Sequence, residues 1–222
     1  MNRAVRVPAE TLREVTASLS ADDRDEMAVP SYSHANPLIR WLFWKRLDTA
    51  IALADLKPSE RIFEFGVGSG VLLPTYHSIA ARVAATDLHL EPAREMARRN
   101  GFPTEFVSVP EFLAWCAAQA GGFDAILALD VLEHVEGDDL TRVSGLFRRL
   151  LAPAGRLIVS GPTESFAYKL GRLIAGFHGE YHHRNIFDID RELRAQWKSE
   201  REIFVPRRPL PHAFLLTRYA PL

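Results

Sequence analysis

Apolar and polar positions follow different periods along this chain, and the period changes at a few clear boundaries. Residues 1–30 are charged and irregular, with one short helix predicted around residues 9–19. A longer helical pattern covers residues 38–56, between Asn36-Pro37 and a break at Lys57-Pro58-Ser59. The sequence therefore predicts a helical N-terminal segment before the first strand.

Between residues 61 and 161, short apolar runs alternate with amphipathic segments. The run FDAILALD is nearly all apolar, as expected for a strand that is covered on both faces. Short links between strands and helices predict a parallel sheet, and right-handed crossovers make that sheet doubly wound. The predicted strands are 61–65, 82–87, 104–109, 123–130 and 156–162, and the predicted helices are 72–80, 91–101, 110–120 and 138–155.

The end of the chain breaks this alternation. A helix is predicted at residues 189–199, followed by strands at 201–206 and 212–221. Too few residues separate these two strands for a crossover helix, so they should form an antiparallel pair. The predicted fold class is α/β, with a doubly wound, mostly parallel seven-stranded sheet and an antiparallel C-terminal strand pair.

The composition of the chain argues against several classes of protein. The chain has 222 residues, of which 47% are hydrophobic and 25% charged, and its net charge is −1. These values fit one globular domain and give no overall basic field for binding nucleic acid. Cys116 is the only cysteine, which excludes an internal disulfide and a thiolate zinc cluster. The N-terminus has no apolar signal-peptide core, and no run reaches the roughly 18 apolar residues of a membrane span, so we expect a cytoplasmic protein.

The residues best suited to chemistry lie after the first predicted strand, in the stretch RIFEFGVGSGVLL. Ligands of open parallel sheets bind beyond the carboxyl ends of the strands, where glycines leave backbone N–H groups accessible. Gly66, Gly68 and Gly70 fit this role, with Glu64 at the end of the strand. Asp87 ends the next strand, where a carboxylate can accept hydrogen bonds from two ribose hydroxyls.

The spacing of the glycines separates two nucleoside cofactors. A dinucleotide site requires G-x-G-x-x-G, but Val71 or Leu73 replaces the third glycine, depending on the register. Glu64 would repel a pyrophosphate, whereas it suits a ligand that carries an ammonium and a sulfonium. Asp87 suits either cofactor and does not distinguish them. Because of Glu64 and the missing third glycine, a nicotinamide-dependent oxidoreductase is only an alternative function. A non-catalytic scaffold protein that binds the cofactor is a second alternative.

The pattern E-x-G-x-G-x-G resembles the first motif of class I S-adenosylmethionine-dependent methyltransferases. The segments FDAILALDVLEHV and LLAPAGRLIVSGP resemble two later motifs of that family, as found in its ubiquinone- and menaquinone-type members. The resemblance covers residues 58–162, and it implies S-adenosylmethionine as the cofactor. The residues that it places at the cofactor are Glu64, Gly66, Gly68, Gly70, Asp87, Leu88, Val109 and Asp130.

One position departs from the family pattern. Members usually carry an acid near the adenine after the third strand, but this chain reads SVPEF there, and Glu111 comes late. Backbone groups near Ser108 and Val109 are the expected substitutes.

The residue patterns at the two ends of this region, residues 58–162, also predict an organisation of the chain. Residues 1–57 form an N-terminal helical lid, and residues 58–222 form the methyltransferase domain, with a substrate cap inserted at about residues 162–188. The expected reaction is O-methylation of a small apolar acceptor, such as a quinone, a lipid or a polyketide-like molecule. No nucleic-acid partner is expected.

The helix predicted at residues 38–56 is rich in aromatic side chains, including Trp41 and Trp44. Two interpretations fit this composition. The helix could line an apolar acceptor pocket, which we favour. Alternatively, its aromatic residues together with Arg40, Lys45 and Arg46 could form a peripheral membrane contact.

Three histidines are candidates for a general base: His182 and His183 in GEYHHRN, and His134 in DVLEHV. Asp130, Glu133 and His134 also resemble the E-x-x-E-H pattern of small-RNA 3′-end methyltransferases and some quinone O-methyltransferases, whose carboxylates and histidines bind a divalent metal. Asp130 replaces the first Glu of that pattern, which shortens its reach. We therefore expect a metal-free site in which His182 or His183 acts as a base or orients the acceptor.

Overall fold

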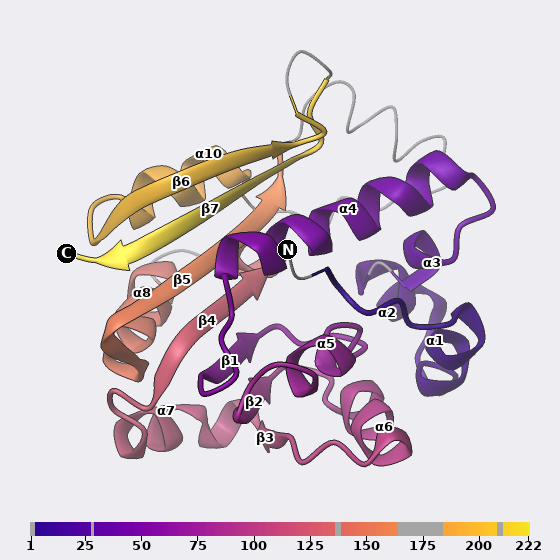
Figure 1. Ribbon diagram of the computed structural model, residues 1–222, viewed down its shortest axis with the longest axis horizontal. Coiled ribbons are helices and arrows are strands. Elements are labelled where there is room, and N and C mark those ends of the chain that lie inside the picture. Colours follow the sequence, from indigo (N-terminus) through magenta and orange to yellow (C-terminus); the bar gives the residue numbers. More distant parts are fainter. Residues whose placement is uncertain (1–2, 28, 136–138, 164–183, 208–210) are drawn as a thin grey trace.

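The computed structural model describes residues 3–27, 29–135, 139–163, 184–207 and 211–222 (Figure 1). Most of the segment predicted as a substrate cap, including His182 and His183, lies outside these described residues. None of the described helices has both the length and the apolar character needed to cross a bilayer.

The described residues form one mixed sheet in the order β3-β2-β1-β4-β5-β7-β6. The strands from β1 to β5 are parallel, whereas β7 runs antiparallel to both β5 and β6. This arrangement confirms the predicted fold class, including the antiparallel C-terminal pair. The strands are β1 (Arg61–Phe65), β2 (Arg82–Thr86), β3 (Glu105–Val107), β4 (Phe123–Leu129), β5 (Leu151–Pro162), β6 (Trp197–Val205) and β7 (Phe214–Pro221).

Helices cover both faces of the sheet and bury two hydrophobic clusters (Figure 1). On one face, α4 (Pro37–Ala54), α5 (Leu73–His77) and α6 (Glu91–Asn100) pack together with the short N-terminal helices. Those short helices are α1 (Ala9–Val15), α2 (Ala21–Glu26) and α3 (Val29–Tyr32). The opposite face is covered by α7 (Val109–Ala118), α8 (Asp139–Leu150) and α10 (Ile186–Leu193).

Helix α4 is fixed at both of its ends. At the start, the Asn36 side chain accepts a hydrogen bond from the Leu38 amide, and Pro37 occupies the first turn, where it loses no hydrogen bond. At the other end, Arg156 of β5 donates to the carbonyl of Ala54. Arg218 of β7 donates to the carbonyl of Leu53 (3.1 Å). The two arginines satisfy carbonyl groups that a helix end leaves free, so they hold α4 against the C-terminal half of the sheet.

Several predicted boundaries were wrong: α1 ends at Val15 and not near residue 19, and α10 begins at Ile186, three residues before its predicted start at 189. Residues 20–32 contain α2 and α3, although no helix was expected there. Strand β5 begins at Leu151, five residues before the predicted start, because α8 ends at Leu150, ahead of Pro153. Finally, the helix predicted to run to residue 199 is wrong in its last residues, because Trp197 already starts β6 and pairs with Pro221 of β7. Its indole Nε1 donates to Ser144 of α8 (2.8 Å), which anchors this residue in the core.

Candidate functional site: a glycine loop beside a buried polar cluster

The loop after β1 depends on its three glycines, which all have positive φ. A Cβ on Gly66 would lie 2.5 Å from Cγ2 of Val131, and one on Gly70 would lie 3.1 Å from the backbone Cα of Ala93. A Cβ on Gly68 would meet nothing closer than Met27, at 3.9 Å. Packing therefore requires glycine at 66 and 70, whereas at 68 its absence of a side chain keeps space open beside the loop.

Asp87 ties this loop to the end of β2. Its Oδ2 accepts a hydrogen bond from the Gly68 amide (2.7 Å), and its Oδ1 accepts one from the His89 amide (3.0 Å). The two bonds fix the orientation of the carboxylate. Each oxygen can still accept a second hydrogen bond, as from the hydroxyls of a ribose.

Glu64 is a buried acid on β1, with 4% of its surface exposed. Burial raises its pKa to about 8; the nearby Tyr76 hydroxyl opposes this shift, and the charge of Asp87 adds to it. The Tyr76 hydroxyl lies close enough to Glu64 to favour the ionised carboxylate. Even so, neither this hydroxyl nor Oε2 of Glu64 makes a hydrogen bond of normal geometry. Such a group is stabilised by a cationic ligand, since a nearby positive charge compensates a buried carboxylate.

Asp130 directly follows β4 and has a left-handed conformation, with φ of 52°. Its Oδ1 accepts a hydrogen bond from the Ser160 hydroxyl of β5 (2.6 Å), and its amide donates to the Ser160 carbonyl (2.9 Å). Its other carboxylate oxygen forms an ion pair with Arg46 of α4. The predicted Asp130 is therefore held by three contacts at the carboxyl end of the sheet.

Arg46 of α4 is buried, with only 3% of its surface exposed. This excludes it from the membrane-facing surface that was the less favoured interpretation of this helix. Besides Asp130, it donates to the Tyr32 hydroxyl (2.7 Å), while its Nε has no hydrogen-bond partner. The rings of Phe43 and Phe214 lie 5.4 and 5.1 Å from its guanidinium carbon. A cation among aromatic rings and one carboxylate forms a compact polar cluster in an otherwise apolar region.

A signal for the inward orientation of Arg46 was present in the sequence. Positions 42, 43 and 50 lie three or four residues from it, so they share its side of the helix, and all three are apolar. A single cation in such a stripe indicates a buried partner, because an unpaired buried charge is very costly.

Two other predicted cofactor residues are exposed. Leu88 follows β2 with 79% of its surface accessible, and Val109 begins α7 with 50% accessible. Before Val109, the Ser108 hydroxyl donates to the carboxylate of Glu111 (2.5 Å), so that acid is engaged within its own helix turn. Leu88 and Val109 lie just beyond the carboxyl ends of the neighbouring strands β2 and β3. Their contact with the cofactor stays a prediction.

The histidine and metal hypotheses stay predictions as well. His134 ends the short 3₁₀ helix η1 (Leu132–His134) and is half-buried. His182 and His183 lie outside the described residues. Within the described part of the chain, no group of three or more His, Cys, Asp or Glu side chains is arranged to hold a metal.

Comparison with known proteins assigns the family. Residues 38–201, which span most of the chain, match the sequence profile of the methyltransferase domain family. The chain belongs to the class I S-adenosylmethionine-dependent methyltransferases. This supports the methyltransferase interpretation over the nicotinamide alternative.

Related sequences and solved structures are consistent with this family assignment. This methyltransferase is 36% identical over 120 residues to the ubiquinone biosynthesis O-methyltransferase of Xanthomonas oryzae pv. oryzae; the match covers 52% of this chain and 48% of the relative. The aligned region thus spans about half the length of that relative. Among solved structures, the PH0226 protein from Pyrococcus horikoshii OT3 has a TM-score of 0.68 at 17% identity, covering 87% of this chain and 96% of that one.

A second structural neighbour carries a cofactor product in its crystal. The N-methyltransferase NodS from Bradyrhizobium japonicum WM9, in complex with S-adenosyl-L-homocysteine, has a TM-score of 0.63 at 17% identity. The alignment covers 95% of this methyltransferase and 98% of NodS. At this identity, the likeness shows the shared fold alone.

The loop residues of this methyltransferase fit the cofactor of its family. S-Adenosylmethionine carries an ammonium, a sulfonium and a ribose, and it has no phosphate. Glu64 supplies a buried acid for the cationic end, Asp87 supplies an oriented carboxylate for hydroxyls, and Gly68 leaves room beside the backbone. The unpartnered Oε2 of Glu64 is the observation that tests this fit, because a bound cation would give it a counter-charge.

Proposed function

We propose that this protein is an enzyme that transfers the methyl group of S-adenosylmethionine to an oxygen of a small, apolar organic acceptor. The observation that carries the proposal is the buried, raised-pKa Glu64 beside the open glycine loop and the oriented Asp87. The name of the 36% identical relatives, ubiquinone biosynthesis O-methyltransferase, supports oxygen as the accepting atom and a quinone-like ring as the acceptor.

The acceptor site in this proposal lies between α4 and the carboxyl ends of β4 and β5. Phe43 packs there against the buried rings of Tyr32 and Phe214, and the Arg46–Asp130 pair provides a fixed polar group among them. Small-molecule sites commonly combine mostly apolar walls with a few placed polar groups. Residues 1–57 act as a lid in this arrangement, because they supply α3 and α4 to the wall of the site.

The cofactor supplies a methyl carbon that is already activated by its positive sulfur. The acceptor oxygen forms a bond to that carbon as the carbon–sulfur bond breaks, and the acceptor proton passes to a base. The protein therefore acts mainly by alignment and by excluding water. His134, His182 and His183 stay our candidates for the base, and Asp130, fixed by Arg46 and Ser160, orients the acceptor at the end of β4.

Methyl transfer can be tested directly with labelled cofactor. The protein is incubated with methyl-labelled S-adenosylmethionine and phenolic acceptors that share one ring and carry alkyl tails of increasing length. We expect labelled O-methyl products by mass spectrometry, with kcat/KM rising as the tail lengthens. Asp87→Ala should weaken cofactor binding by about 1.5–3 kcal/mol, since it removes charged hydrogen-bond acceptors.

The outcomes separate the alternatives. Cofactor binding by calorimetry without transfer to any acceptor would favour the non-catalytic scaffold. Oxidation of reduced nicotinamide dinucleotide without S-adenosylmethionine binding would favour the oxidoreductase. Equal transfer to tailed and tailless acceptors would contradict the apolar acceptor site while leaving methyl transfer intact.

A further inference from the structure

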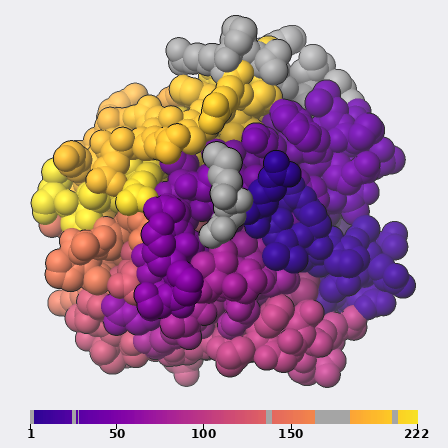
Figure 2. Space-filling view, viewed as in Figure 1, coloured from indigo at the N-terminus to yellow at the C-terminus, as the bar shows by residue number. Residues whose placement is uncertain are grey.

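A cavity of about 950 Å³ opens on the outer side of α4, away from the cofactor loop. Its walls come from the N-terminal segment, from α4 and the residues that follow it, and from β6. Figure 2 shows this face, on which the indigo N-terminal segment, purple α4 and gold β6 are all exposed. We call this cavity the α4 groove. Glu64, Asp87 and the three loop glycines do not line it.

The α4 groove is strongly basic, although the whole chain has a net charge of −1. Its two acids are already neutralised, because Asp48 pairs with Arg6 (2.7 Å) and Asp55 pairs with Lys57 (2.7 Å). Within the described part of the chain, five further cations of the lining have no acidic partner. These are Arg3, Arg40, Lys45, Arg201 and Arg207.

Apolar side chains lie between these cations. Trp41 lines the groove with 46% of its surface exposed, and Ile203 of β6 also contributes to the lining. The ring of Trp44 is covered by the guanidinium of Arg6, whose central carbon lies 4.5 Å from the ring centroid. A large exposed tryptophan beside cations without acidic partners indicates a binding site for an anion that also has an apolar part.

We propose that the α4 groove binds a phosphate-bearing anion whose apolar portion lies against Trp41. Charge complementarity requires an anionic ligand, and several of the free cations are arginines, whose planar forks match phosphate oxygens. The volume lies within the range of small-molecule sites, and the cations come from three separate segments that the fold brings together. Phosphate on an apolar body occurs in phospholipid headgroups and in soluble phosphate esters, and both share this chemistry.

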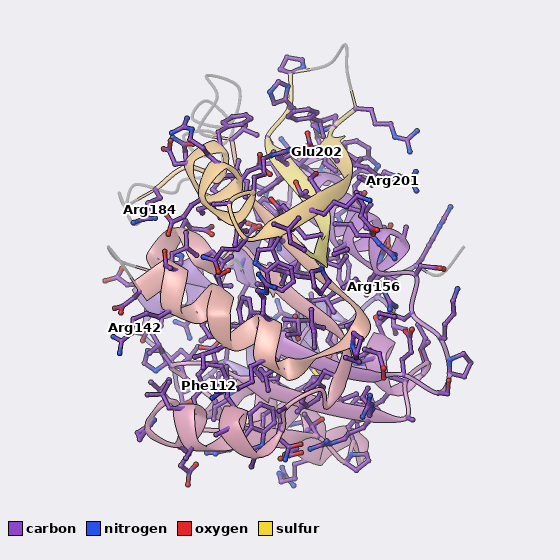
Figure 3. All side chains as sticks on the ribbon, turned by 90° about the vertical axis from the view of Figure 1, so that its left-hand side faces the viewer. Phe112, Arg142, Arg156, Arg184, Arg201 and Glu202 are labelled. Atoms are coloured by element: carbon purple, nitrogen blue, oxygen red, sulfur yellow. The ribbon has the colours of Figure 1, made fainter. Side chains whose placement is uncertain are left out.

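The groove shares Tyr32 with the wall of the proposed acceptor site, but its cations are not part of the cofactor loop, so its test needs no turnover. The charge-reversal variant Lys45→Glu/Arg201→Glu removes two of the free cations. The matched control, Arg142→Glu/Arg149→Glu, makes the same charge change on α8, on the opposite face of the sheet. Figure 3 shows Arg201 and Arg142 on opposite sides of the molecule. Both variants should bind S-adenosylmethionine like the wild type, which shows that they fold.

Two probes distinguish the sources of phosphate. Inorganic diphosphate is titrated by calorimetry, and sedimentation measures binding to vesicles of neutral phospholipid with and without an anionic phospholipid. We expect the groove variant to bind about thirtyfold more weakly than the wild type, since each cation near a phosphate surface contributes roughly 1 kcal/mol. The control variant should match the wild type.

Each result has one meaning. Binding to anionic vesicles, with competition by diphosphate, supports a lipid headgroup as the source. Diphosphate binding without vesicle binding supports a soluble phosphate ester. If the wild type binds neither probe, or if the groove variant and the α8 control lose affinity equally, the proposal is overturned.

Discussion

A carboxylic acid that is buried near a second acid keeps its proton at neutral pH. It ionises when a bound cation stabilises the carboxylate that water can no longer solvate. In the unliganded protein, Glu64 is in this position, with a pKa raised to about 8 mainly by burial. A cofactor with a positive charge favours the carboxylate, so binding below pH 8 must release a proton. The affinity of this site is therefore tied to pH through one residue.

We predict that the affinity for S-adenosylmethionine rises as the pH is raised from 6 to 8, by up to about tenfold per pH unit. Glu64→Gln should bind more weakly and lose most of this dependence, because its amide has no proton to release. Calorimetry at pH 6, 7 and 8 measures both proteins, and the variant corrects for titration of the cofactor itself. Parallel pH profiles in the two proteins would remove Glu64 from the cofactor site.

The same residue should affect stability in the opposite direction. Its folded pKa lies above the ordinary value of 4.5, so its contribution to stability is complete below that value and is lost as the pH rises toward 8. Without cofactor, the free energy of unfolding of the wild type should fall relative to Glu64→Gln between about pH 5 and 8, by on the order of 4 kcal/mol. Urea denaturation at pH 5, 6.5 and 8 measures this difference; a constant difference would mean that the acid is ionised when buried.

The glycines of the loop should separate packing from binding. Gly66→Ala places a methyl group against Val131 and should destabilise the fold by more than 2 kcal/mol. Gly68→Ala has space and should cost only about 1 kcal/mol, from its positive φ, while it weakens cofactor binding. Thermal unfolding and cofactor titration of both variants measure the two effects, and a Gly68→Ala protein with normal affinity would show that the cofactor does not approach this position.

At the scale of single elements, α4 joins the N-terminal helices to the carboxyl ends of β4 and β5 through one ion pair. Both partners are largely withdrawn from water, since the Arg46 and Asp130 side chains are 4% and 19% exposed. Removing one partner of a buried pair leaves the other charge uncompensated, whereas removing both avoids that cost.

We therefore predict a strong coupling across this contact. Arg46→Met and Asp130→Asn should each destabilise the protein by about 3–5 kcal/mol, and the double variant should cost clearly less than their sum. The exposed Arg142–Asp139 pair of α8 provides the control, with an expected coupling below about 0.5 kcal/mol. Additive effects at Arg46 and Asp130, measured by urea denaturation, would contradict the ion pair.

The periodic elements could be predicted from sequence because their signals are local. The first strand was placed at residues 61–65, where β1 lies, and Gly101 was expected to end the helix that it caps in α6. The start of β6 was missed, since Trp197 continues a helical pattern and becomes a strand residue only by pairing with β7. The helix α2 had a local signal, because Ser20 and Asp23 exchange hydrogen bonds as in a capping box.

The candidate site also has a part that sequence spacing predicted and a part that it did not. Glu64, the glycines and Asp87 follow two neighbouring strands, so their spacing already indicated a common ligand. The Arg46–Asp130 contact joins an N-terminal helix to a central strand, and sequence spacing contains no information about which helix covers that strand end. Such contacts depend on the order of strands in the sheet, which only the folded structure provides.

For the molecule as a whole, the N-terminal helices are part of the core. Leu12, Leu47 and Ile51 belong to the same hydrophobic cluster as residues of the sheet. Deleting residues 1–56 should therefore leave Arg156 and Arg218 without the carbonyls that they bind, and should expose apolar surface. We expect loss of cooperative unfolding and strong binding of a hydrophobic dye. A truncated protein with a sharp thermal transition would show instead that residues 57–222 fold alone.

The contact between Arg218 and Leu53 also has a consequence for how the chain is made, because its partners are 165 residues apart. At the usual speed of protein synthesis, the arginine leaves the ribosome roughly 8–33 seconds after the helix that it holds. Until the end of this interval, α4 lacks β7, the last in chain order of the three strands β5, β6 and β7 that pack against it. Nascent chains that stop before β7 should remain open to protease, and protection should appear only once the last strand has emerged.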